Sequence, residues 1–375
     1  MREGGTKHVA IVLPPKERFT PAAAGAVSLV VRDLARATPP GWSAEVLGRD
    51  PGGEPFPGIA FRALRPSLLD AIPGGRNAAF ARAAARALRA DPPDVIEAHN
   101  RAPLALVLAA RLPRTPVLLV LHNEARLSQG LATAAERAAA LRRLCGIVCV
   151  SDFVRRGVVD GLPPALAARV HAIPNGLPLD ALPPPAADRE RLILFVGRLT
   201  PEKGADAFVA ACARALPALP GWRAEAIGAR WYGGGRESPY VAALRRDAAA
   251  AGIAMPGFRD NAATLSRMAQ AAIVVVPSRW PEPLGRVAQE ALACGAAVVS
   301  SGRGGLPEAT GEAALTADPD SPDALAGAIL RLARDHALRA ELAERGQRHV
   351  ARYSMAATTA RWTALREALQ ATARG

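Results

Sequence analysis

Short apolar runs alternate with longer segments of helical periodicity along the whole chain. Each run is rich in Val, Ile, Leu or Ala and ends in a Pro, Gly or polar cluster, which is typical of strands buried on both faces of a parallel sheet. The pattern predicts strands at 8–13, 44–47, 59–64, 94–98, 117–121, 146–150, 170–173, 192–196, 224–227, 273–276, 296–300 and 313–316. It predicts helices at 26–37, at 77–90, after 284, and from 321 to the end. The fold class is therefore α/β, and 375 residues are enough for two domains with full cores.

The stretch 277–295 combines a strand exit, a Pro-punctuated turn and a helix. Glu282 precedes this helix and Glu290 lies inside it, about 12 Å further along at 1.5 Å per residue. The first helical amides, around Leu284, Gly285 and Arg286, have no intrahelical acceptor and form a candidate anion or hydroxyl site. Gly285 would let a ligand approach the backbone closely. Two glutamates alone are more typical of a solvated acidic pair, so the surrounding residues must decide.

Those surrounding residues resemble glycosyltransferase family 4. Glu282, Pro283, Leu284, Gly285 and Glu290 follow the E-x7-E motif of that family, with Leu284 in place of its usual Phe. The segment 304–308, Gly-Gly-Leu-Pro-Glu, also matches. The resemblance covers nearly the whole chain and is strongest over 191–316. It implies the GT-B fold, two Rossmann-like domains facing across a cleft, and a retaining hexosyltransferase that uses a nucleoside-diphosphate sugar.

The resemblance also implies a domain organisation. We expect an acceptor-binding domain at 1–177, a Pro- and Ala-rich linker at 178–190, and a nucleotide-sugar-binding domain at 191–350. The segment 351–375, with Tyr353-Ser354 and Trp362, resembles the terminal helix that crosses back onto the first domain in this family.

A second cluster follows the strand at 192–196, where the chain reads Gly-Arg-Leu-Thr-Pro-Glu-Lys-Gly. Two cations at a strand-to-helix turn suit a diphosphate. Gly197, Arg198 and Lys203 match the pyrophosphate-binding positions of the family. The alternative is a surface ion pair between Lys203 and Glu202.

The family's remaining donor contacts map onto this chain residue by residue. The resemblance gives Glu282 the sugar hydroxyls and Glu290 the ribose hydroxyls. It places Gly257 and Phe258 near the nucleotide base. The backbone at Pro283, Leu284 and Gly285 would contact the phosphates.

Two polar triplets lie at strand ends in the first half, His99-Asn100-Arg101 and His122-Asn123-Glu124. Ligands of α/β sheets bind at such carboxyl ends. His122 resembles the family histidine that faces the transferred sugar, so we expect catalytic roles for His122, Glu282, Arg198 and Lys203. His99 would help to shape the acceptor pocket. Gly25 is the best match to the family's Gly-containing loop at the cleft, and a plain turn is the alternative.

A formal net charge of +13 raises the question of nucleic acid. The basic residues are spread along the chain, nearly all are Arg, and they are not interleaved with stacking aromatics, so we exclude a nucleic-acid partner. Arg82, Arg86 and Arg89 form one stripe on the helix at 77–90. The stripe is either a solvated face or a surface for an anionic membrane.

No metal and no cofactor are expected, because Arg198, Lys203 and helix amides would stabilise the leaving diphosphate and no Asp-x-Asp motif stands out. Cysteines 145, 149, 212 and 294 lack C-x-x-C spacing and predict buried free thiols.

We expect a cytoplasmic protein, with peripheral binding at the inner membrane face, and a UDP- or GDP-linked donor. The acceptor would be a glycan or lipid-linked, in lipopolysaccharide or exopolysaccharide synthesis. The alternatives are a non-transferring nucleotide-sugar-binding protein and a sugar-nucleotide epimerase.

Overall fold

The computed structural model describes residues 5–67, 70, 75–230 and 238–374. Two compact units make up the chain: residues 1–177 with 355–375, and residues 178–354. The Gly-rich segment at 229–235, which the sequence allows as a lid or as a surface loop, lies mostly outside the described residues.

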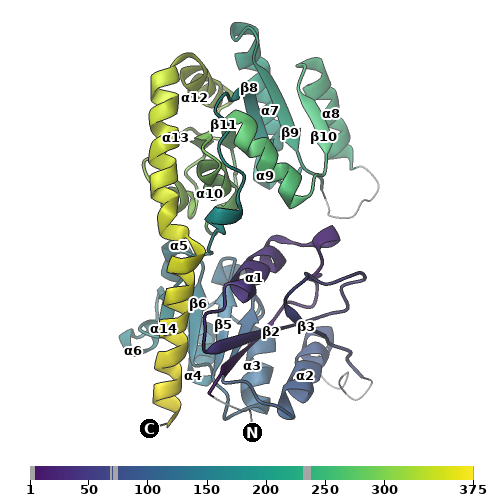
Figure 1. Ribbon diagram of the computed structural model, residues 1–375, viewed down its shortest axis with the longest axis vertical. Coiled ribbons are helices and arrows are strands. Elements are labelled where there is room, and N and C mark those ends of the chain that lie inside the picture. Colours follow the sequence, from purple (N-terminus) through teal and green to yellow (C-terminus); the bar gives the residue numbers. More distant parts are fainter. Residues whose placement is uncertain (1–4, 68–69, 71–74, 231–237, 375) are drawn as a thin grey trace. The chain divides into compact units, whose positions relative to one another are not determined.

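The first unit is built on a seven-stranded sheet of order β3-β2-β1-β4-β5-β6-β7, in which every pairing is parallel (Figure 1). The strands are β1 (Lys7–Val12), β2 (Trp42–Gly48), β3 (Ala60–Ala63), β4 (Val95–His99), β5 (Val117–Leu121), β6 (Gly146–Cys149) and β7 (Val170–Ala172). The helices are α1 (Ala26–Arg36), α2 (Gly75–Arg89), α3 (Ala102–Arg111), α4 (Ala134–Arg143), α5 (Asp152–Val159), α6 (Pro164–Ala167) and α14 (Met355–Arg374). On one face of the sheet, α1 and Trp362 of α14 join a core that includes Val9, Ile11 and Val95.

The second unit repeats this plan with six parallel strands of order β10-β9-β8-β11-β12-β13. The strands are β8 (Glu190–Val196), β9 (Arg223–Ile227), β10 (Ala254–Gly257), β11 (Ala271–Val276), β12 (Ala297–Ser300) and β13 (Ala314–Thr316). The helices are α7 (Ala205–Ala215), α8 (Pro239–Ala250), α9 (Asn261–Gln270), α10 (Arg286–Ala293), α11 (Leu306–Thr310), α12 (Pro322–Arg334) and α13 (His336–Val350).

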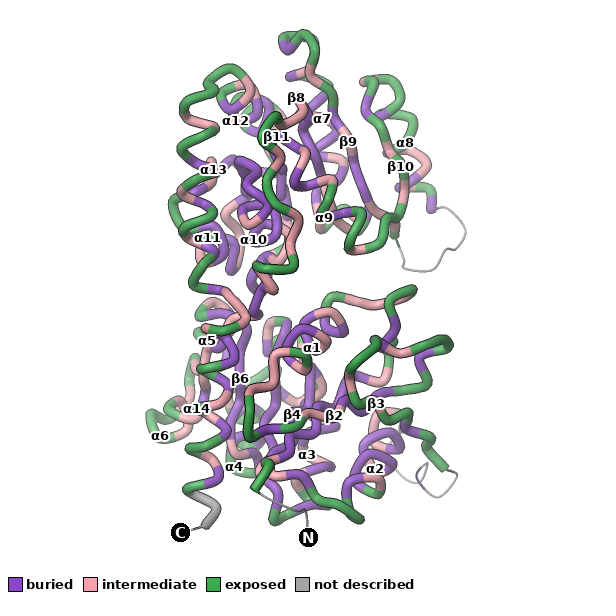
Figure 2. The backbone as a smooth tube through the Cα atoms, viewed as in Figure 1, coloured by how far each residue is buried: buried purple, intermediate pink, exposed green. Residues whose placement is uncertain are grey.

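Strand β8 shows why its sequence reads as a continuous apolar run. Ile193 and Phe195 belong to one core, with α7, α8 and α12, whereas Leu192 and Leu194 belong to another, with α9 and α10. Successive strand residues point to opposite faces, and helices cover both faces of this sheet. Strand β11 is accordingly buried along its whole length and β8 is buried over residues 192–195 (Figure 2).

Both sheets have the strand order of a Rossmann-type doubly wound sheet, and this order locates the sites. The direction of winding reverses between β1 and β4 in the first unit, and between β8 and β11 in the second. Ligands of open α/β sheets bind outside the carboxyl ends of the strands at such switch points. The segments that follow β4, β8 and β11 are therefore the places to examine.

Three local features differ from the expectation. Residues 178–190 belong to the second unit, because Arg189 donates hydrogen bonds to the carbonyls of Met268, Ala271 and Cys294. The segment from 321 to the end, which the sequence predicts as helical, forms three helices. Asp335 caps α13 and so separates it from α12, and the extended backbone at Ser354 separates α13 from α14. The Pro-Gly pair inside β10 is tolerated because β10 is an edge strand.

Candidate functional sites

The switch point of the second unit joins two loops. One follows β8 and carries Gly197, Arg198 and the 3-10 turn Pro201–Lys203. The other follows β11 and carries residues 277–285. The carbonyl of Glu202 accepts three hydrogen bonds from the second loop: Ser278 Oγ at 3.1 Å, Arg279 N at 2.9 Å and Trp280 N at 3.0 Å. One acceptor thus fixes both loops in register.

Gly204 brings the two loops into direct contact. Its backbone is left-handed, with φ of 70°, and a Cβ atom at this position would lie 2.0 Å from the carbonyl oxygen of Pro277. Only glycine fits such an approach without a shift of the backbone. The sequence reading treated Gly204 as the start of a helix and did not identify this packing role.

Lys203 and Glu282 form an ion pair across the joined loops. Lys203 Nζ lies 2.6 Å from Glu282 Oε1, and the two side chains retain 24% and 11% of their exposure. The partner of Lys203 is therefore Glu282, at a sequence distance of 79 residues, and not the neighbouring Glu202. The pair places a primary ammonium, which suits phosphate oxygens, beside a carboxylate, which accepts from hydroxyl groups.

Backbone contacts hold Glu282 in place. The segment around Glu282 forms a parallel bridge with Gly304, and Gly305 N donates to the carbonyl of Glu282 at 2.6 Å. A Cβ atom on Gly304 would lie 2.5 Å from Glu282 N, and one on Gly305 would lie 2.5 Å from the carbonyl oxygen of Pro283. The two glycines therefore give a physical reason for the Gly-Gly pair noted in the sequence.

Gly285 is the N-cap of helix α10 and has a φ of 97°. Leu284 is buried before it. Inside the helix, Arg286 Nε donates to Glu290 Oε1 at 2.7 Å, and the Glu290 side chain is 8% exposed. Glu290 is thus enclosed and already paired with a cation of its own helix.

Three glycines lie in a row at the strand ends beside this site. Gly197 follows β8, Gly228 follows β9 and Gly257 ends β10. Gly228 N donates to the carbonyl of Gly257 at 2.9 Å, and a Cβ atom on Gly228 would lie 1.8 Å from the carbonyl oxygen of Gly197. Arg198 is exposed at one end of the row, and Phe258 is 46% exposed at the other.

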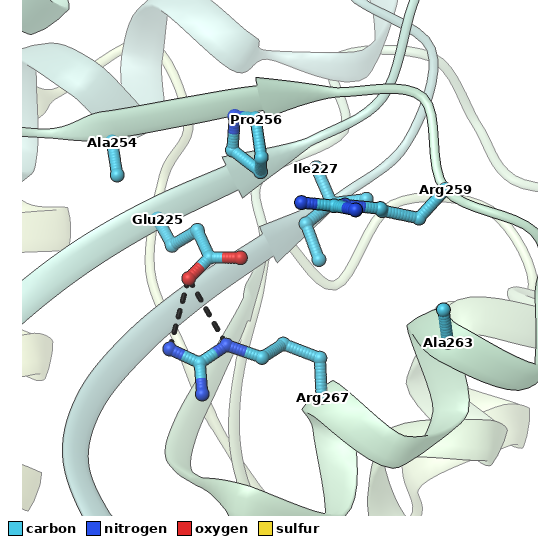
Figure 3. Close-up of a pocket in the computed structure, with 7 residues that line it drawn as sticks. All are labelled: Glu225, Ile227, Ala254, Pro256, Arg259, Ala263 and Arg267. Atoms are coloured by element: carbon cyan, nitrogen blue, oxygen red, sulfur yellow. Dashed lines mark hydrogen bonds and ion pairs between the residues drawn. The ribbon is translucent and has the colours of Figure 1, made fainter.

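A cavity of about 350 Å³ opens between β9, β10 and α9, next to this row (Figure 3). Arg267 donates two hydrogen bonds to Glu225 on its wall, and the Arg259 side chain extends over Ile227. Pro256 lines the cavity and precedes Gly257 and Phe258, which the family resemblance places near a nucleotide base.

An ion-pair network supports the second loop from outside. Arg279 donates to Asp206 at 2.8 Å and 2.9 Å and to Asp320 at 2.7 Å. The hydrogen bonds to Asp206 and Asp320 raise the pKa of Arg279. Sequence reasoning missed this network because its members are far apart in the chain and follow no motif.

In the first unit, His99 and His122 share a hydrogen bond. His99 Nδ1 lies 2.8 Å from His122 Nε2, and both side chains are buried. Burial lowers the pKa of His122 to about 4. Burial, followed by the charges of His122 and Arg366, lowers the pKa of His99 well below its usual range. Both rings are therefore neutral at pH 7.

Asn100 joins the two strand ends. It is the single non-glycine residue with a positive φ, 58°, among the residues described, and asparagine tolerates this conformation better than most residues. Its amide N donates to the carbonyl of Val120 at 2.7 Å, and its Oδ1 accepts from His122 N at 2.8 Å. The sequence predicted that both triplets lie at strand ends, but it did not predict the contact between the rings of His99 and His122.

A buried ion pair lies on the same strand as His99. Arg366 Nε of α14 donates to Glu97 Oε1 at 2.7 Å, and the two side chains are 1% and 0% exposed. The Arg366 guanidinium also packs over the rings of Trp42 and Trp362. Glu97 and His99 are two residues apart on β4, so their side chains share one face of the sheet.

Gly25 is the N-cap of α1 and has an ordinary φ of −80°. A Cβ atom there would lie 2.6 Å from Glu17 Oε2, which accepts from Ser28 Oγ at 2.9 Å. Gly25 therefore leaves room for a carboxylate, and its place in a ligand site stays a prediction.

The basic stripe of α2 is partly neutralised within the fold. Arg86 pairs with Asp70, and Arg82 donates to the Asp70 carbonyl. The hydrogen bond from Arg86 lowers the pKa of Asp70 to about 2. Among the residues that the structure describes, no helix has the length and apolar character to cross a membrane, and no group of three or more metal-ligating side chains occurs.

Comparison with known proteins assigns both halves of the chain. Residues 183–349 match the family "Glycosyl transferases group 1", and residues 27–181 match "Glycosyltransferase Family 4". The chain belongs to glycosyltransferase family 4. It is accordingly a glycosyltransferase of the hexosyltransferase class, as the resemblance of the sequence implied.

Individual relatives of this glycosyltransferase are distant. The putative glycosyltransferase YtcC of Bacillus subtilis is 29% identical over 300 residues, which cover 72% of this chain and 71% of that protein. Other curated relatives align over 23% to 69% of their own lengths.

Solved structures show the same fold. Sucrose-phosphate synthase of Thermosynechococcus elongatus has a TM-score of 0.75 and 24% identity, covering 98% of this chain and 100% of that one. HepE of Anabaena, solved in complex with UDP-glucose, has a TM-score of 0.76 and 20% identity, covering 96% and 99%. The α/β fold of the glycosyltransferase is therefore GT-B.

Proposed function

We propose that this glycosyltransferase transfers a sugar from a nucleoside-diphosphate sugar to a glycan or lipid-linked acceptor, with retention of anomeric configuration. The observation that carries the proposal is the Lys203–Glu282 pair at the switch point of the second unit. A diphosphate would take the ammonium of Lys203 and so release the carboxylate of Glu282 for sugar hydroxyls. The binding of one end of the donor would then prepare the site for the other end.

The rest of the site fits the same substrate class. When the bond between the anomeric carbon and the diphosphate oxygen breaks, its electron pair remains on the diphosphate. Lys203, Arg198 and the first amides of α10 would stabilise that charge, and no metal or other cofactor is invoked. The glycine row at 197, 228 and 257 lets a ligand approach the backbone closely.

The adjacent cavity and Phe258 suit a nucleotide base, and Glu290 would reach its ribose by exchanging the hydrogen bond from Arg286. HepE, a structural neighbour, was solved with UDP and with UDP-glucose. We favour a UDP- or GDP-linked donor. For the acceptor, we favour lipopolysaccharide or exopolysaccharide intermediates, at the cytoplasmic face of an anionic membrane. Helix α2 gives the membrane part limited support, since Asp70 binds two of its three stripe arginines.

The test is nucleotide-dependent thermal stabilisation, with UDP, GDP, ADP and TDP, each alone and as sugar conjugates. We expect one base to stabilise the parent chain, and we expect Lys203→Ala to lose this stabilisation together with orders of magnitude in donor turnover. Arg214→Ala, a change at a half-exposed arginine of α7 in the same unit, serves as the matched control and should behave as the parent. Near-normal turnover by Lys203→Ala would refute the phosphate role, and no shift with any nucleotide would refute the donor class.

A further inference from the structure

The hydrogen bond between His99 and His122 has only one proton to share. A neutral imidazole carries a single N–H. If His99 donates from Nδ1, then His122 accepts at Nε2 and carries its own proton on Nδ1. If His122 donates instead, then His99 carries its proton on Nε2. Nδ1 of His122 is a hydrogen-bond donor in the first arrangement and an acceptor in the second. This atom has no hydrogen-bond partner among the described residues.

The surroundings of His99 decide between these arrangements. His99 Nε2 is buried and no hydrogen-bond partner for it is present among the residues that the structure describes. An unpaired buried N–H is rarer and more costly than an unpaired acceptor, so the proton is disfavoured on this atom.

The frame around the pair is rigid enough to preserve one arrangement. Asn100 holds the backbone of both strand ends, and Glu97 holds Arg366 in the core beside His99. His99 is the last residue of β4 and His122 follows directly from β5, and these two strands are neighbours in the sheet. Neither ring can turn without breaking the 2.8 Å contact that joins them.

We propose that His99 is a positioning residue, which donates from Nδ1 to His122 and thereby holds His122 with its proton on Nδ1. His122 then presents an N–H donor to its ligand and has no lone pair there to remove a proton. The ligand would be an oxygen of the transferred sugar, and this clause rests on the proposed function. His122 would orient that oxygen by donating a hydrogen bond and would not act as a general base.

The tautomer is measured without any substrate. The full chain, labelled with 15N-histidine, is examined at pH 7 by long-range 1H–15N correlation, which separates protonated from unprotonated ring nitrogens. His122→Gln assigns the signals. We expect the parent His122 to be protonated at Nδ1 and unprotonated at Nε2. The reverse pattern would overturn the proposal.

Two substitutions then test the role of His99. In His99→Asn the side-chain amide places an N–H near the former Nδ1, so His122 should keep its tautomer. In His99→Asp the carboxylate can only accept, so the proton should move to Nε2 of His122. An unchanged tautomer in His99→Asp would overturn the proposal. If His99→Asp does not fold, the parent spectrum alone decides, because the reverse pattern there overturns the proposal.

Turnover separates this inference from the proposed function. With an active nucleotide-sugar, His99→Asp should lower kcat about tenfold, equivalent to one lost hydrogen bond, with little change in KM for the donor. His99→Asn should recover most of that loss. Equal kcat values for the two variants would contradict the positioning role. The inferred tautomer in a chain that turns over no nucleotide-sugar would contradict the proposed function and still support the role of His99 toward His122.

Discussion

Replacing Gly204 by alanine should separate the two loops that carry Lys203 and Glu282. The new Cβ would lie 2.0 Å from the carbonyl oxygen of Pro277 and 2.9 Å from its carbon, both of them backbone atoms. Neither atom can yield by a side-chain rotation, so a loop must move. Gly252 supplies a matched control, because its φ of 66° is close to the 70° of Gly204 and nothing lies within 4 Å of a Cβ placed there.

The expected difference in free energy of unfolding between Gly204→Ala and Gly252→Ala follows from the effects that the two variants do and do not share. Both pay left-handed backbone strain of about 1–2 kcal/mol, and both lose some freedom in the unfolded chain, worth about 0.4–1 kcal/mol in the opposite direction. Only Gly204→Ala adds the clash, for which overpacking gives about 1–3 kcal/mol. The two free energies of unfolding should therefore differ by about 1–3 kcal/mol.

Urea unfolding of the full chain measures this difference, with the parent alongside. The site provides a second reading, since nucleotide-dependent stabilisation should be weakened in Gly204→Ala and retained in Gly252→Ala. Equal free energies of unfolding for the two variants would refute the contact between Gly204 and Pro277. A destabilised Gly204→Ala that still binds nucleotide normally would refute the view that the donor site needs both loops in register.

Two further predictions concern the first unit. Arg366→Met should lower the free energy of unfolding by about 3–5 kcal/mol, because it leaves the Glu97 carboxylate buried without its cation; Arg361→Met, an exposed change on the same helix, should stay within about 0.5 kcal/mol. Thermal and urea unfolding measure both, and a similar loss in the two variants would contradict the buried-pair argument. Lowering the pH should also destabilise this unit, because the folded pKa of His122 is about 4 against 6.5 for an ordinary histidine. The unfolded chain then binds more protons between these values, and stability is lost as the pH falls below about 6.5, by about 1 kcal/mol at about pH 5.5 from His122 alone. His122→Gln should flatten this slope, and a slope identical to that of the parent would show that another group is responsible.

The local pattern predicted the strands well because each buried strand must be apolar on both faces. It placed β8 and β11 within a few residues, and it placed Lys203, Glu282 and His122 at the ends of the correct strands. It predicted no strand at β10, which contains Pro256 and Gly257, because the edge position that tolerates these residues is a property of the assembled sheet.

The partners of the site residues were harder to predict than their positions. The Lys203–Glu282 pair spans 79 residues and the Glu97–Arg366 pair spans 269. Such contacts depend on which strands become neighbours, and no periodicity within a single segment records that choice. The sequence pattern predicts a helix start at Gly204 and a loop at Gly228, whereas steric contact with another backbone is what requires glycine at both.

The pairing of Glu97 with Arg366 has a consequence for synthesis of the protein. Glu97 leaves the ribosome 269 residues before the arginine that neutralises it, an interval of roughly 13–54 s at the usual 5–20 residues per second. The second unit is one continuous stretch and is translated entirely within that interval. Until α14 has been synthesised, the Glu97 carboxylate of the nascent first unit has no Arg366 to pair with, so the last step in the folding of this unit is expected after the second unit has been translated. Truncation just before Met355 should accordingly harm the half of the protein that was made first.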